Sequence, residues 1–152
     1  MTDKEFKQLN FKLPHEYNIK SRGTIIGNDQ YKPDISITNS KGEVVCCIES
    51  SSSGDRKATL AEMLQAEKYA YDSFNILELV ICLSGSSKYS PTPKSQKAYL
   101  KPYFYFLKEI RNNKNKGISR IYLITELDFI DFMEKNKVIL SDEFMKICEV
   151  LE

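Results

Sequence analysis

Residues 31–51 read YKPDISITNSKGEVVCCIESS, and this stretch decides the fold. Residues 34–38 alternate between apolar and polar side chains, which is typical of a half-buried strand. Residues 43–48 are almost continuously apolar, which favours a central strand of a sheet. The sequence NSKG between them has the chemistry of a turn. The pattern therefore predicts a hairpin that begins with Asp34 and ends just before Glu49.

The rest of the chain alternates between helical and strand patterns. Apolar residues at helical spacing, and apolar runs of strand length, predict the remaining elements. The expected helices are 3–13, 56–72, 95–112, 127–135 and 141–151, and the expected strands are 23–27, 76–83 and 118–125. Helices 56–72 and 95–112 are long enough to connect parallel strands. The fold class that follows is α/β, with a mixed β-sheet and helices on both of its faces.

The length and composition describe an ordinary globular protein. A chain of 152 residues, 41% hydrophobic and 28% charged, predicts one domain over residues 1–152 and excludes extensive disorder. No apolar run is long enough to span a membrane, and the charged N-terminus does not have the form of a signal peptide. We therefore expect a cytoplasmic protein with no membrane partner.

The titratable residues exclude several kinds of site. With 22 basic and 21 acidic residues, the net charge of +1 provides no global attraction for nucleic acid, so DNA contacts would have to be local or shared with a partner. The four cysteines form no C-x-x-C pair, and three of them lie in apolar runs, which predicts reduced, buried thiols. The single histidine, His15, argues against a His/Cys metal site and against a Ser-His-Asp triad.

Two carboxylates are the principal candidate site residues. The predicted hairpin brings Asp34 and Glu49 to one end of the sheet, where they would repel each other unless a positive charge neutralised them. A hard divalent cation prefers such oxygen ligands, polarises a phosphodiester and activates a water molecule. The alternative is that Asp34 is a turn residue and Glu49 a solvated charge at a strand end.

The order of these features resembles a known family. Pro33-Asp34, a hairpin, an apolar strand that ends in Glu49, and a following helix with Gln65 and Tyr69 in a Q-x-x-x-Y pattern resemble the PD-(D/E)XK nuclease superfamily. The closest likeness is to type IIS restriction endonuclease cleavage domains. It extends from Tyr31 to the C-terminus through the segments LVICLSGSSK, IYLITELDFIDFM and LSDEF. The resemblance implies a restriction-endonuclease-like mixed sheet flanked by helices.

The resemblance also implies roles for individual residues. Asp34, Glu49 and the backbone carbonyl of Ser50 would bind Mg²⁺, for which Mn²⁺ could substitute. Gln65 and Tyr69 would brace the site or contact the phosphate. The alternative for Gln65 is an ordinary position on the helix surface.

One position departs from the family pattern. Ser51 stands where the family has a lysine, which would orient the attacking water and offset negative charge. Lys57 and Lys68 on the following helix are the candidates to replace it. Lys68 is favoured because it lies three residues after Gln65, on nearly the same helix face. The alternative is that both are surface lysines.

The functional hypothesis is a Mg²⁺-dependent endonuclease that cleaves double-stranded DNA. A chain of this length would serve as the small cleavage or nicking subunit beside a larger recognition subunit, or act alone as a homodimer in repair or defence. The alternative is a catalytically inactive interaction or DNA-binding subunit that keeps the nuclease fold. Positive charge that could meet phosphates is concentrated at Lys88, Lys94, Lys97, Lys101, Lys108, Arg111, Lys114 and Lys116. The rings at Tyr99 and 103–106 are too many for one buried helix face, which predicts a subunit contact.

Overall fold

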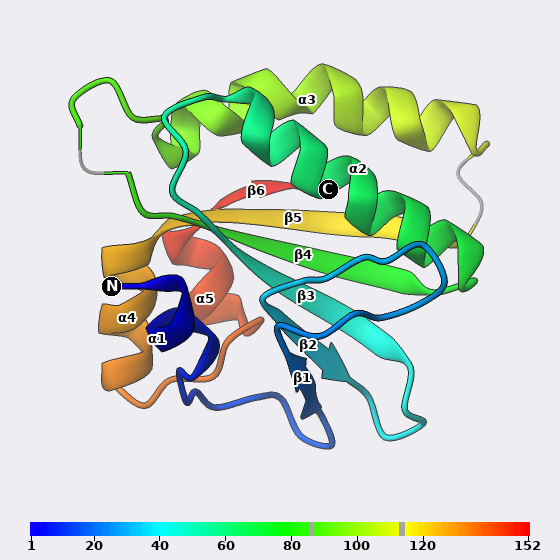
Figure 1. The fold of residues 1–152 in the computed structure, drawn as a ribbon, viewed down its shortest axis with the longest axis horizontal. Coiled ribbons are helices and arrows are strands. Elements are labelled where there is room, and N and C mark those ends of the chain that lie inside the picture. The colour runs from blue at the N-terminus through cyan, green and yellow to red at the C-terminus, as the bar shows by residue number, and fades with distance from the viewer. Residues whose placement is uncertain (86, 113–114) are drawn as a thin grey trace.

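The computed structural model describes residues 1–85, 87–112 and 115–152, and its centre is one six-stranded mixed sheet (Figure 1). The strands follow one another in the sheet in their chain order. They are β1 (Asn18–Arg22), β2 (Ile35–Thr38), β3 (Val44–Ser51), β4 (Ile76–Leu83), β5 (Gly117–Thr125) and β6 (Glu149–Leu151). The α/β class with a mixed sheet is therefore confirmed.

The predicted hairpin is present as the antiparallel pair β2 and β3. Ile35 faces Ile48 in the register, so the residues just beyond this pair, Asp34 and Glu49, come together at one end of the hairpin. Strands β3, β4 and β5 are parallel to one another, as the long crossovers predicted. Their carboxyl ends consequently meet at the same edge of the sheet, at Ser51, Leu83 and Thr125.

The helices form a layer on each face of the sheet (Figure 1). Helices α2 (Lys57–Asp72) and α3 (Pro93–Ile110) cover one face. Helices α1 (Asp3–Lys7), α4 (Glu126–Glu134) and α5 (Asp142–Ile147) cover the other. The sheet is therefore buried on both sides, which explains why its central strands read as continuous apolar runs.

The structure corrects the expected helix 3–13, because the helix ends at Lys7. The guanidinium of Arg22 donates hydrogen bonds to the carbonyls of Lys7 (2.6 Å) and Leu9 (2.8 Å). These bonds satisfy backbone acceptors that a longer helix would use internally, so the chain leaves the helical path there.

The structure corrects two further expectations. The expected strand 23–27 is a loop, because Gly23 and Gly27 have positive φ angles, and the first strand is instead β1. The expected helix 141–151 divides into α5 and β6, because Cys148 is extended and the residues after it pair antiparallel with β5. Tertiary pairing with a sheet edge overrides local helical spacing in this segment.

Helix α3 contains a proline at its first position and another in its interior. The helix begins at Pro93, and the hydroxyl of Thr92 accepts a hydrogen bond from the backbone N–H of Ser95. Pro102 lies inside the helix.

No helix among the described residues is long and apolar enough to cross a membrane.

A buried ion pair ties α2 to the far end of α3. Glu67 and Arg111 are 7% and 8% exposed, and Arg111 Nη1 donates to Glu67 Oε2 at 2.8 Å. The same guanidinium donates to the carbonyl of Ile118, and the Glu67 carboxylate accepts the Ile118 N–H. Gly117 borders the pair, where a Cβ atom would overlap both side chains. Removing one partner would leave the other charge buried alone.

We expect Glu67→Ala to lower the free energy of unfolding by about 3–5 kcal/mol, because Arg111 would keep its buried charge without a counter-ion. Urea unfolding followed by circular dichroism measures this change. Glu109→Ala, an exposed carboxylate on α3, is the matched control and should change stability by less than about 0.5 kcal/mol. Equal effects of the two substitutions would contradict the assignment.

Candidate active site

At the end of the hairpin, the carboxylates of Asp34 and Glu49 each accept a backbone hydrogen bond from the opposite strand. The backbone N–H of Ser50 donates to Asp34 Oδ2 at 2.7 Å, and the backbone N–H of Asp34 approaches Glu49 Oε2 at 3.4 Å. Each carboxylate thus accepts a hydrogen bond from the neighbouring strand end. The two predicted site residues are therefore brought together.

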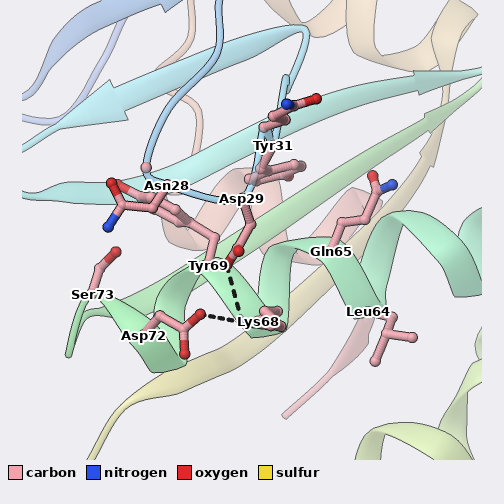
Figure 2. A pocket seen from close by; sticks show the side chains of 11 residues that line it. Asn28, Asp29, Tyr31, Leu64, Gln65, Lys68, Tyr69, Asp72 and Ser73 are labelled. Carbon is pink, nitrogen blue, oxygen red and sulfur yellow. Dashed lines mark hydrogen bonds and ion pairs between the residues drawn. The ribbon is translucent and has the colours of Figure 1, made fainter.

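One tyrosine binds the Glu49 carboxylate, and a second tyrosine packs beside the first. The hydroxyl of Tyr31, a side chain only 5% exposed, donates to Glu49 Oε1 at 2.8 Å. The centroid of the Tyr69 ring is 5.9 Å from that of Tyr31, and both residues line the pocket in Figure 2. The sequence did not identify Tyr31 as a site residue, although it lies only three residues before Asp34.

A third carboxylate, Glu62 on α2, faces the same place and was also missed. Its Oε2 is buried and has no hydrogen-bond partner among the residues that the structure describes. Its position three residues before Gln65 is one helical turn away, a spacing that could have identified it. The Glu62 carboxyl interacts with Glu49, with Asp34 and with the Ser51 hydroxyl, so it lies near the end of the hairpin.

These acidic groups are held in an environment that disfavours their charged forms. Burial, followed by the nearby charge of Asp34, raises the pKa of Glu49 to about 7, although the Tyr31 hydrogen bond opposes the change. Burial, followed by the charge of Glu49, raises the pKa of Glu62 to about 8, against a favourable contact with the Ser51 hydroxyl. Burial also raises the pKa of Asp34. A divalent cation bound to these carboxylates would favour their charged forms.

The two serines after Glu49 face different neighbours. The hydroxyl of Ser50 lies 3.5 Å from Glu126 Oε2 at the start of α4, so Glu126 is a further acidic group that sequence reasoning missed. Ser51 is 5% exposed, and its carbonyl accepts the backbone N–H of Ser84 at 3.0 Å. Ser51 therefore lies at the lysine position of the family pattern without a charge to contribute.

The structure does not bring Lys68 to the carboxylates. Its ammonium pairs with Asp29 at 3.0 Å and with Asp72, in a pocket of about 680 Å³ between α2 and the loop that precedes Tyr31 (Figure 2). Gln65 lines this pocket and is exposed on the α2 surface. Lys68 therefore forms a surface ion pair and does not supply positive charge to Asp34.

Lys57, the second lysine candidate, is exposed at the first position of α2. The ion pair that does involve Asp34 is formed by Lys7, whose Nζ lies 3.7 Å from Asp34 Oδ1. Lys7 belongs to a segment that the sequence pattern gave no role, and nothing in its local sequence marks it.

The basic segment 88–116 is only partly available to a ligand. Arg111 is buried in the ion pair with Glu67. The expectation that it belongs to a phosphate-binding surface is therefore wrong. Lys88 and Lys94 are exposed near the start of α3. Lys114 lies outside the described residues.

The cysteines agree with the expectation for reduced thiols. All four are free: Cys46, Cys47 and Cys82 are buried in the sheet, and Cys148 is half-buried. Burial raises the pKa of each thiol, which keeps it protonated and unreactive.

The donor set has the chemistry that Mg²⁺ prefers. Asp34 and Glu49 present carboxylate oxygens, Glu62 presents an oxygen without a partner, and the carbonyl of Ser50 is adjacent in the chain. Mg²⁺ in proteins commonly takes one or two carboxylates and completes its shell with water and phosphate oxygens. Across the described ranges, no three or more His, Cys, Asp or Glu side chains are placed so that they could hold a metal ion together, so Asp34, Glu49 and Glu62 do not form a complete ligand set.

Comparison of the chain with protein-family models, with curated proteins and with solved structures gives no match. The likeness to PD-(D/E)XK nucleases therefore stands on the residues quoted from the sequence.

The raised pKa values predict how metal-free protein responds to pH. Glu62 keeps its proton in the folded state up to about pH 8 and loses it near 4.5 when unfolded, so rising pH between these values favours the unfolded state. The free energy of unfolding should therefore fall as the pH rises through this range. Glu62→Gln should be more stable than the wild type at pH 8, since each unit of pKa difference corresponds to about 1.4 kcal/mol.

Urea unfolding in the presence of a chelator, repeated across this pH range, measures the effect. Glu43→Gln, which changes an exposed carboxylate at the turn, is the control. A Glu62→Gln stability difference that stays constant with pH would show that Glu62 is not held in its neutral form.

Proposed function

We propose that this protein is a metal-dependent endonuclease that hydrolyses a phosphodiester bond of double-stranded DNA, acting as the cleavage or nicking subunit of a restriction system. The observation that carries the proposal is the cluster of Asp34, Glu49 and Glu62, three buried or half-buried carboxylates at one strand end. Such a cluster is unfavourable for stability alone, and a divalent cation on a phosphate would make it favourable.

Each residue of the site has a role in this proposal. Asp34 and Glu49 would hold Mg²⁺ or Mn²⁺, with the carbonyl of Ser50 as a third ligand and Glu62 facing the cation or its water. Bound there, the cation would lower the pKa of a water molecule and offset negative charge on the phosphate. Tyr31 fixes one oxygen of Glu49 by its hydrogen bond, so the carboxylate stays oriented as the substrate arrives.

The proposed partners are double-stranded DNA and a second polypeptide, either a larger recognition subunit or another copy of this chain. Exposed apolar side chains on the outer helix layer support a protein contact: Phe106 is 58% and Ile110 60% exposed on α3, and Leu64 is 55% exposed on α2. Phe104 is buried while its neighbours Tyr103 and Phe106 are exposed, so the rings of α3 do extend beyond the core face. Free thiols support a reducing compartment, and we propose the cytoplasm.

Ser51 favours a second candidate function. A site without the family lysine could belong to an inactive subunit that binds DNA or protein through the nuclease fold. The carboxylate cluster argues for activity, because a site that binds no cation gains nothing from three adjacent acidic groups.

We expect the purified protein to nick or cut supercoiled plasmid in Mg²⁺ or Mn²⁺, and Asp34→Asn or Glu49→Gln to slow this reaction at least about a hundredfold. Agarose electrophoresis of plasmid, with and without candidate partner subunits, measures the rates. Glu43→Gln is the matched control, since it removes an exposed carboxylate of the same hairpin without touching the site.

Two results would contradict the proposal. Full activity in both Asp34→Asn and Glu49→Gln would remove the site assignment. A wild type that never cuts, together with a Ser51→Lys variant that does, would establish the inactive subunit instead.

A further inference from the structure

A basic side chain of the first helix pairs with a carboxylate of the proposed active site. Lys7 is the last residue of α1, and its Nζ lies 3.7 Å from Asp34 Oδ1. Within the described part of the chain, it is the one basic side chain that forms an ion pair with Asp34 or Glu49.

Helix α1 is anchored firmly enough to position this ammonium. Thr2 and Glu5 form a reciprocal capping box at its start, and the ring of Phe6 is buried 6.2 Å from that of Phe129. At its other end, Arg22 of β1 binds the carbonyl of Lys7 itself. A helix of five residues has little stability of its own, so these contacts determine where Lys7 lies.

Gly23 provides the space for the Lys7 side chain. A Cβ atom at Gly23 would lie 2.9 Å from Lys7 Cδ and 3.3 Å from Lys7 Nζ. A larger residue would therefore push the stem and the ammonium away from Asp34. The residue before it, Arg22, holds the Lys7 backbone, so one short segment of β1 and its following loop fixes both ends of the lysine.

The ion pair between Lys7 and Asp34 is partly accessible to solvent. The side chain of Lys7 is 30% exposed and that of Asp34 is 19% exposed. The other lysines considered do not share this position, because Lys68 is paired with Asp29 and Asp72 and Lys57 is exposed at the start of α2.

We infer that Lys7 supplies the positive charge that Ser51 cannot supply, and that it acts on the scissile phosphate from the N-terminal helix. This inference rests on the proposed nuclease function. In the hydrolysis, the water oxygen gives a proton to solvent and forms a bond to phosphorus, one phosphorus–oxygen ester bond breaks, and the leaving oxygen takes up a proton from solvent. The Lys7 ammonium stabilises the negative charge that grows on the phosphate oxygens.

Lys7→Met separates charge from packing, because methionine keeps most of the aliphatic stem against Gly23 and removes the ammonium. We expect this variant to nick supercoiled plasmid about 10²–10³-fold more slowly than the wild type in Mg²⁺. Lys7→Arg, which keeps the charge, should stay within about tenfold. Lys4→Met is the matched control on an exposed position of the same helix and should cut at the wild-type rate.

A second measurement, made without DNA, distinguishes a Lys7 charge that acts on the phosphate from a purely structural role of Lys7. Mn²⁺ alone is titrated into each variant by calorimetry. Removing a positive charge near the cation should make Lys7→Met bind Mn²⁺ more tightly than the wild type, by at least about threefold. Slower cleavage combined with tighter metal binding is the expected signature.

Weaker Mn²⁺ binding by Lys7→Met would show that Lys7 only orients Asp34, and would overturn the inference. Cleavage by Lys7→Met within threefold of the wild type, with Glu49→Gln inactive, would overturn it while leaving the nuclease function in place. A wild type that cuts no plasmid under any metal or partner condition would refute the proposed function, and the role of Lys7 with it.

Discussion

The end of the β2–β3 hairpin is the constraint on which the candidate site depends. The Ser50 N–H binds the Asp34 carboxylate, and the Asp34 N–H points to the Glu49 carboxylate, so each acidic residue is held by the backbone of the other strand. These contacts keep two like charges adjacent. Burial raises the pKa of both carboxyl groups, and the charge of Asp34 adds to the rise at Glu49.

The sheet distributes the remaining site residues between its two helix layers. Side chains alternate along β3, so Cys47 belongs to the core beneath α2 and α3, and Ile48 to the core beneath α1, α4 and α5. By the same alternation, Glu49 meets Tyr31 and Ser50 meets Glu126. Two charged side chains approach the hairpin end from opposite helix layers, Glu62 from α2 and Lys7 from α1.

Two glutamates of α2 differ in how their carboxylates are satisfied. Both carboxylate oxygens of Glu67 accept hydrogen bonds from Arg111, whereas Glu62 Oε2, five residues earlier, is buried without a hydrogen-bond partner among the described residues. A protein normally satisfies buried polar groups. Glu62 lies toward the end of α2 that follows the strand edge where β3 to β5 finish.

The amino-acid sequence by itself determined the hairpin, the parallel crossovers and the pairing of Asp34 with Glu49. These follow from alternation, apolar runs and turn residues, which act over a few neighbouring positions. Local pattern could not place the ends of α1 and α5, because Arg22 and the β5 edge, both distant in the chain, decide them. Only the tertiary structure decided that Lys68 forms an ion pair with Asp29, while Lys7 forms one with Asp34. The partner of a long, flexible charged side chain depends on which segments the fold brings near it, and sequence spacing carries that information only within one element.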